Sequence, residues 1–392
     1  MSAQPLYDLA PLAQLMLLGG GMALGPLAWV GWRNRGRGSG RHLQALTVLT
    51  LFLTFDLVLF GAFTRLTDSG LGCPDWPGCY GNASPLGAHT AIAAAQEALP
   101  SGPVTHGKAW VEMIHRYLAT GVGALIMVMA LAAWWQHRQA RRGCAEPLPV
   151  HPWWPAFTLF WVCLQGAFGA LTVTMKLFPA IVTLHLLGGL GLLVLLTVQA
   201  VRHGQAVLAT PSEALSQGSR RALWAVGGLV VLQVVLGGWV STNYAVLACT
   251  TFPLCQGSWW PAMDFEQGFQ LWRALGVLQD GSHISFAALT AIHYVHRLMA
   301  YVVLLSLGGL VWHLHQARVL RRQARWLLGL AALQLATGLS NVVLGWPLLA
   351  AVLHTGGAAA LLAVLSWALT ASRAAPAPEN VSAPQRASRV SV

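Results

Sequence analysis

Charged residues are scarce in this chain of 392 residues. Asp, Glu, Lys and Arg together make up only 9% of it, whereas 56% of the residues are hydrophobic and the mean hydropathy is +0.58. Because a soluble globular protein carries about 25% charged residues, this composition excludes the soluble classes. We therefore predict an all-α polytopic membrane protein.

Basic residues are also absent before the first apolar stretch, whereas a secretory signal peptide begins with a positively charged segment. We expect that stretch to be a retained helix. Since a spanning helix needs about 20 apolar residues, the sequence predicts about nine spans. They lie near residues 11–31, 43–66, 109–135, 153–175, 180–201, 222–243, 284–314, 326–345 and 347–372.

The arginines are confined to alternate loops. Seventeen of the 23 Lys and Arg residues follow the first, third, fifth, seventh and ninth predicted spans. These residues are Arg33, Arg35, Arg37, Arg41, Arg138, Arg141, Arg142, Arg202, Arg220, Arg221, Arg318, Arg321, Arg322, Arg325, Arg373, Arg386 and Arg389. The positive-inside rule makes this side cytoplasmic. We expect a periplasmic N-terminus and a cytoplasmic C-terminus. Because membrane topology accounts for the positions of these basic residues, the net charge of +11 does not indicate a nucleic-acid partner.

Two parts of the chain repeat each other. A shift of 176 positions places Cys73 and Cys79 on Cys249 and Cys255, and it places Gly61 on Gly237. A shift of 169 positions places other matching residues on each other, namely Leu184-His185 on Leu353-His354, Leu164-Gln165 on Leu333-Gln334 and Gly169 on Gly338. We predict two parallel four-helix halves, with the first span outside the repeat.

The two long segments on the outer side, near 67–108 and 244–283, carry the cysteine pairs. An oxidising compartment and the short spacing favour two disulfides, Cys73–Cys79 and Cys249–Cys255. Free thiols or a metal pair are the alternatives. Cys144 and Cys163 have no evident partner.

Each half contributes two histidines inside predicted spans, and histidine in a membrane span is a functional candidate. They are His115, His185, His296 and His354. In the predicted topology all four helices run from outside to inside, so the imidazoles lie at similar depth and can face the two sides of a heme. One histidine per helix is atypical of zinc, whose ligands cluster and often include Cys or carboxylate. A hydrogen bond to a neighbouring carbonyl or a proton path is the alternative for any single histidine.

Glu112 lies three residues before His115, so both share a helix face. A carboxylate there can move protons, or it can simply reach water at the membrane surface. The repeat places His293 at the matching position, which makes it a competitor of His296 as a ligand. Arg116 and Arg297 follow the two ligand candidates and are candidate partners for heme propionates; otherwise they anchor the helices at the headgroups.

These motifs resemble the bacterial heme A synthase family, over roughly residues 45–370. The resemblance rests on the run from Gly61 to Gly81, on Glu112-Met-Ile-His115-Arg116, on His296-Arg297 and on the two Leu-His pairs. It implies an oxidoreductase that converts heme O to heme A for cytochrome c oxidase. It further implies that His115 and His185 bind substrate heme, that His296 and His354 ligate a heme b cofactor, and that Glu112 is the catalytic carboxylate.

The repeat and the composition predict the domain organisation, in which the first span departs from the family pattern, and the resemblance implies the role of each half and the partners. We expect an extra N-terminal helix and loop (1–42), a substrate half (43–201), a cytoplasmic linker (202–221), a heme b half (222–372) and a disordered tail (373–392). The expected partners are heme O, the bilayer, heme O synthase, oxidase assembly factors, an electron donor such as quinol, and a second copy of the chain, in the bacterial inner membrane. A di-heme cytochrome b-like electron carrier is the alternative, and the lack of a carboxylate twin for Glu112 favours the enzyme.

Overall fold

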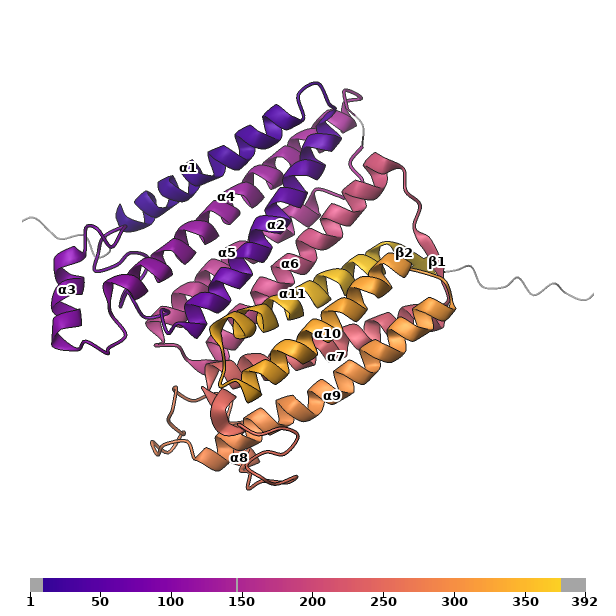
Figure 1. Ribbon diagram of the computed structural model, residues 1–392. Coiled ribbons are helices and arrows are strands. Elements are labelled where there is room, and N and C mark those ends of the chain that lie inside the picture. The colour runs from indigo at the N-terminus through magenta and orange to yellow at the C-terminus, as the bar shows by residue number, and fades with distance from the viewer. Residues whose placement is uncertain (1–9, 146, 375–392) are drawn as a thin grey trace, which may run out of the picture.

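The computed structural model describes residues 10–145 and 147–374 (Figure 1). Within them, nine helices are long and apolar enough to cross a membrane, so the predicted number and order of spans are confirmed. They are α1 (Ala10–Arg33), α2 (Ser39–Leu66), α4 (His106–Arg141), α5 (Trp153–Thr174), α6 (Pro179–Leu208), α7 (Gln217–Thr242), α9 (Phe286–Gln316), α10 (Arg321–Val343) and α11 (Leu348–Thr370). The protein is an all-α multi-pass membrane protein.

Local capping fixes several helix ends beyond the apolar stretches. The Thr105 side chain accepts a hydrogen bond from the amide of Lys108, so α4 begins three residues before the predicted position 109. Ser216 and Ser285 cap α7 and α9 in the same way. Hydropathy does not detect the polar first turns of α4 and α7, which explains why these two helices begin before their predicted spans.

The helices pack in two rings of four (Figure 1). In the first ring α2 contacts α4 and α6, and α5 contacts α4 and α6; in the second α7 contacts α9 and α11, and α10 contacts α9 and α11. The rings meet where α6 and α11 contact each other and where α2 contacts α11 and α6 contacts α7. The division into two halves with the predicted boundaries stays a proposal, which this packing supports.

Helix α1 lies outside both rings and packs along α4 (Figure 1). Its buried residues recur mainly four apart, at Pro11, Leu15, Gly19 and Ala23. At Gly19 the two backbones come so close that an added Cβ would lie 2.6 Å from Cβ of Thr120. Only glycine allows this approach.

Residues that the repeat matches meet each other at the outer end of the interface between the rings. Arg65 matches Ser241 under the shift of 176 positions, and its Nη2 donates to the Ser241 carbonyl at 2.6 Å. Asp68 matches Tyr244, whose hydroxyl donates to Oδ1 of Asp68 at 2.6 Å. The guanidinium of Arg65 also lies 4.1 Å from the centre of the Tyr244 ring. These contacts tie the end of α2 to the end of α7 and to Tyr244.

The connections at the two ends of the bundle differ. The long segment before α4 carries α3 (His89–Ala98), and the segment before α9 carries η1 (Ala245–Ala248) and α8 (Phe265–Gly268), all at one end of the bundle (Figure 1). At the opposite end, β1 (Glu213–Leu215) pairs in parallel with β2 (Ser372–Ala374). Composition did not predict this small sheet, because three residues carry too little pattern. Of the tail predicted as disordered, residues 375–392 lie outside the described residues.

We predict that Arg65→Gln lowers the free energy of unfolding by about 2 kcal/mol, since it removes a charge-assisted hydrogen bond across the interface. Unfolding in mixed micelles, followed by circular dichroism, measures the change. Arg141→Gln is the matched control, because Arg141 is exposed and has no ion pair within the described residues. Equal stability of both variants would contradict the role of Arg65.

Candidate functional site

The four predicted histidines occupy two pairs of equivalent depths. His115 is the tenth residue of α4 and His296 the eleventh of α9, whereas His185 and His354 are each the seventh residue of α6 and α11. All four side chains are half-buried. Counted from the helix starts, His296 therefore lies one position further along than His115.

His296 and His354 lie opposite each other in the second ring. Their ring centroids are 6.4 Å apart and the ring planes are nearly perpendicular, at 84°. Each Nδ1 has a polar neighbour: the Gln233 amide lies 3.1 Å from Nδ1 of His296, and the Thr337 hydroxyl lies 3.0 Å from Nδ1 of His354. Both rings are therefore oriented through Nδ1.

The neighbour of His354 determines which of its ring nitrogens carries the proton. Thr337 donates its hydroxyl hydrogen to the Leu333 carbonyl at 2.7 Å, so its oxygen accepts from His354 Nδ1–H. Nε2 of His354 then keeps its lone pair, which is the form that binds a metal. The Gln233 amide nitrogen lies 3.1 Å from both Nδ1 and the backbone carbonyl of His296, so it holds that ring at two points.

The same two positions are apolar in the first ring. The repeat matches Gln233 with Leu57 and Thr337 with Phe168. Accordingly, Nδ1 of His185 is buried without a hydrogen-bond partner in the described residues. His115 instead stacks on Phe60, with 6.4 Å between the ring centroids and 9° between the planes. The first pair of imidazoles therefore lacks the polar orientation of the second.

A glycine on a neighbouring helix faces each of the four imidazoles. A Cβ added at Gly61 would lie 3.0 Å from Nε2 of His115, and one at Gly237 would lie 2.9 Å from Cε1 of His296. The corresponding distances to Cε1 are 3.5 Å from Gly169 to His185 and 3.2 Å from Gly338 to His354. The backbone beside each ring thus leaves room that any other residue would fill.

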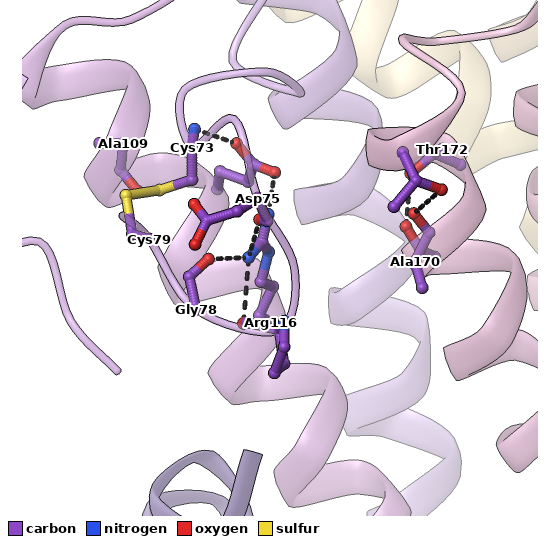
Figure 2. Close-up of polar contacts among 12 residues, drawn as sticks. Cys73, Asp75, Gly78, Cys79, Ala109, Arg116, Ala170 and Thr172 are labelled. Atoms are coloured by element: carbon purple, nitrogen blue, oxygen red, sulfur yellow. Dashed lines mark hydrogen bonds and ion pairs between the residues drawn. A yellow bond between two sulfur atoms is a disulfide. The ribbon is translucent and has the colours of Figure 1, made fainter. Parts of the chain in front are cut away.

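Glu112 and Arg116 join α4 to the first disulfide loop (Figure 2). The buried Glu112 accepts a hydrogen bond from the Cys73 amide at 2.8 Å and forms an ion pair with Arg116 at 2.5 Å. Nη1 of Arg116 donates to the carbonyls of Asp75, Pro77 and Gly78, at 3.1, 3.0 and 2.5 Å. The pair therefore holds the loop against the outer end of the first ring.

In the second ring His293 and Arg297 make the matching contacts. Nη1 of Arg297 donates to the carbonyls of Thr251 and Leu254, and Nη2 donates to that of Cys249. His293 is only 5% exposed; its Nδ1 lies 3.0 Å from the Ala245 carbonyl and its Nε2 lies 3.4 Å from Arg297. Both ring nitrogens of His293 therefore contact protein groups of the loop and of α9, and the choice of His296 as the ligand stays a prediction.

Both cysteine pairs are bonded, with Cα atoms 4.9 Å apart for Cys73–Cys79 and 4.8 Å apart for Cys249–Cys255. The four cysteines of these two pairs are fully buried. Cys144 and Cys163 are free and exposed. The described residues contain no group of three or more His, Cys, Asp or Glu that could hold a metal ion, as a zinc site would need.

The chain matches the COX15-CtaA family, described as cytochrome oxidase assembly proteins, over residues 44–366. It is 37% identical to a heme A synthase of Shewanella oneidensis over 83% of this chain and 94% of that protein. Heme A synthases of Chelativorans and Alkalihalophilus pseudofirmus are 30% and 26% identical over 81% and 71% of this chain, and 87% and 78% of their own lengths. The chain belongs to the heme A synthase family.

The residues of the second ring fit the heme that this family implies. His296 and His354, whose ring centroids lie 6.4 Å apart on opposite helices of the ring, would hold a heme iron between them. The donor set, two imidazoles with polar neighbours at Nδ1 and with glycines beside them, suits a large planar ligand.

Sequence reasoning did not identify the glycines and the polar side chains that lie beside the four histidines. The pairs Gly61/Gly237 and Gly169/Gly338 were visible in the repeat, and their conservation between halves was the available signal. Gln233 and Thr337 left no such signal, because their counterparts are Leu57 and Phe168. Nη1 of Arg116 and Nη1 of Arg297 donate to loop carbonyls, contacts that sequence reasoning also missed, and the role of both arginines as propionate partners stays a prediction.

We predict that Gly237→Val reduces the heme retained by the purified protein about tenfold, because overpacking beside an imidazole costs about 1–3 kcal/mol. Heme absorbance per mole of protein measures the effect. Gly228→Val on the same helix is the control, since an added Cβ there has no neighbour within 4 Å. If both variants keep equal heme, the glycine is not part of the site.

Proposed function

We propose that this protein oxidises a methyl group of heme O to a formyl group, which gives heme A for cytochrome c oxidase. Its membership of the heme A synthase family supports the reaction, and its four half-buried histidines support binding of two hemes. Methyl oxidation exceeds the chemistry of protein side chains, so a redox cofactor is required. A substrate as apolar as heme O enters most readily from the bilayer, and the catalyst is accordingly built from membrane helices.

The difference between the two histidine pairs supports a different role for each half. Gln233 and Thr337 orient His296 and His354 through Nδ1, whereas Leu57 and Phe168 stand at the matching places in the first half. Oriented ligands bind a metal more tightly. We therefore assign permanent heme b to His296 and His354, and exchangeable substrate heme to His115 and His185.

Heme b, when bound, supplies one-electron redox chemistry. The protein's own groups hold and enclose the reactants. His115 and His185 bind the substrate through its iron and fix its orientation across the first ring. Glu112 lies three residues before His115, and its carboxylate, held by Arg116 and the Cys73 amide, is placed to take up protons released at the outer end. The disulfide loop covers that end against water.

We further propose the orientation and partners that the charge distribution and the family support. The basic ends of the helices face the cytoplasm, so the described start of α1 faces the periplasm of the bacterial inner membrane. Heme O synthase would supply the substrate, and oxidase assembly factors would receive the product. The electron donor is a quinol or another membrane-soluble reductant. A second copy of the chain is a further partner that we propose. Heme propionates facing Arg116 and Arg297 stay a separate prediction.

We predict that His296→Ala and His354→Ala each abolish most heme B binding in heme-replete cells, because loss of one axial ligand removes a metal–nitrogen bond. His115→Ala and His185→Ala should keep heme B but stop heme A production. Extraction of the pigments and their identification by mass provides both readouts. His293→Ala is the control and should keep its heme.

Normal heme B in both His296→Ala and His354→Ala would disprove the ligand assignment. The pigments of the wild-type protein test the reaction separately. Heme O or its hydroxylated derivatives beside heme B indicate a synthase, whereas heme B alone, with no heme A made in cells, would indicate an electron carrier.

We predict that Glu112→Gln lowers heme A yield at least about a hundredfold, as expected for loss of a proton-transferring group, while heme B stays and heme O accumulates. Glutamine keeps a carbonyl oxygen for the Cys73 amide, so the loop should remain closed. Protection of the Cys73–Cys79 disulfide from a water-soluble reductant, read out by alkylation of the thiols released, measures this. A normal heme A yield would refute the catalytic role. Loss of activity together with exposure of the two cysteines would show that Glu112 acts only by holding the loop.

A further inference from the structure

A groove lies between the end of α1 and the start of α2. The turn that joins these helices is at the same end of the bundle as β1 and β2, opposite the long segments that carry α3 and α8 (Figure 1). Its volume is about 480 Å³. One wall is apolar and aromatic, and polar and basic side chains surround the other end. The lining residues that matter below are Trp29, Arg37, Arg41, Ala45, Val48 and Phe52.

The turn between the two helices positions the two arginines. Asn34 is buried and its side chain donates to the Val30 carbonyl at 2.9 Å, which closes the end of α1. The Arg37 amide then donates to the Asn34 carbonyl at 3.0 Å, and Gly36 adopts a left-handed conformation with φ of +75°. Because the backbone of the turn is hydrogen-bonded, both guanidiniums start from a fixed base at the mouth of the groove.

Neither arginine is neutralised by the protein. Both are exposed, and within residues 10–145 and 147–374 the only ion pairs are Arg65–Asp68 and Arg116–Glu112. Two unpaired guanidiniums beside one cavity favour an anion, and their planar donors match phosphate oxygens. The groove therefore has a phosphate-binding end.

The rest of the groove is suited to a hydrocarbon chain. Val48 and Phe52 lie one helical turn apart on α2 and are 49% and 61% exposed, and Trp29 on α1 is 50% exposed. They continue from the arginines into the apolar part of the span. A free phosphate or a nucleotide would leave this wall bare, whereas a phospholipid places its phosphate at the membrane surface and its acyl chain below it.

We propose that this groove binds one anionic glycerophospholipid, with the phosphate on Arg37 and Arg41 and an acyl chain against Val48 and Phe52. The site is separate from the histidine pairs, because its residues lie on α1, the turn and α2, whereas the four histidines lie on α4, α6, α9 and α11. Its two arginines precede residues 44–366, the part that matches the family. The lipid fills the space where α1, which packs mainly on α4, leaves α2.

Native mass spectrometry of the full chain tests the proposal after reconstitution in nanodiscs of equal phosphatidylglycerol and phosphatidylcholine. We expect the wild-type protein to retain phosphatidylglycerol preferentially. Arg37→Gln/Arg41→Gln should lower the ratio of retained phosphatidylglycerol to phosphatidylcholine roughly thirtyfold, since each arginine at a membrane surface contributes about a factor of five. Arg141→Gln/Arg142→Gln removes the same charge from another exposed loop at the same end and should keep the ratio.

Ala45→Trp tests the groove itself, because it fills the cavity and leaves both arginines in place. It should release phosphatidylglycerol, whereas Val231→Trp on the exposed face of α7 should not. Heme content and helicity verify that each variant is folded. The proposal is overturned if Arg37→Gln/Arg41→Gln keeps the wild-type ratio, if the two double variants lose it equally, or if Ala45→Trp retains the lipid. Displacement of the lipid by millimolar inorganic phosphate would also overturn it, since that marks a site for free anions.

Discussion

Each of the two proposed heme sites depends on one constraint: an imidazole must lie beside a bare stretch of backbone inside an apolar bundle. A heme is wide and planar, so a helix next to its ligand can carry no side chain at that level. Gly61, Gly169, Gly237 and Gly338 meet this requirement, one for each histidine. The pairing also explains why the repeat keeps these glycines together with the histidines, although the helices around them have otherwise diverged.

Duplication kept the scaffold and changed the chemistry. Arg116 and Arg297 both hold a disulfide loop through its carbonyls, so the outer ends of the two halves are built alike. The differences lie next to the histidines. Polar Gln233 and Thr337 stand where the first half has Leu57 and Phe168, and Glu112 stands where the second half has His293. In the assignment that we propose, one half thus has heme ligands with polar neighbours, and the other has a carboxylate one helical turn from a histidine with an apolar neighbour.

The sequence was sufficient for what depends on composition and on the repeat: nine spans, two bonded cysteine pairs and four histidines at matching depths. The sequence was insufficient for contacts between residues that lie far apart along the chain. The approach of the loops to Arg116 and Arg297 depends on how some forty residues fold back over the bundle, which no local pattern encodes. Likewise, the buried contacts of His293 and the polar neighbours of His296 come from other helices and loops, and only the structure relates them.

The most direct test of the account removes the orienting groups and leaves all four histidines in place. In the variant Gln233→Leu/Thr337→Val, position 233 receives the residue that the first half has at the matching place, Leu57. Position 337 receives valine, which has the shape of threonine but no hydroxyl group. Pigments extracted from the purified variant are then quantified by mass. The account predicts that heme B falls about tenfold or more, in the range seen when outer contacts of metal ligands are lost, while substrate heme is still bound by the first half. Wild-type heme B content in this variant would contradict it.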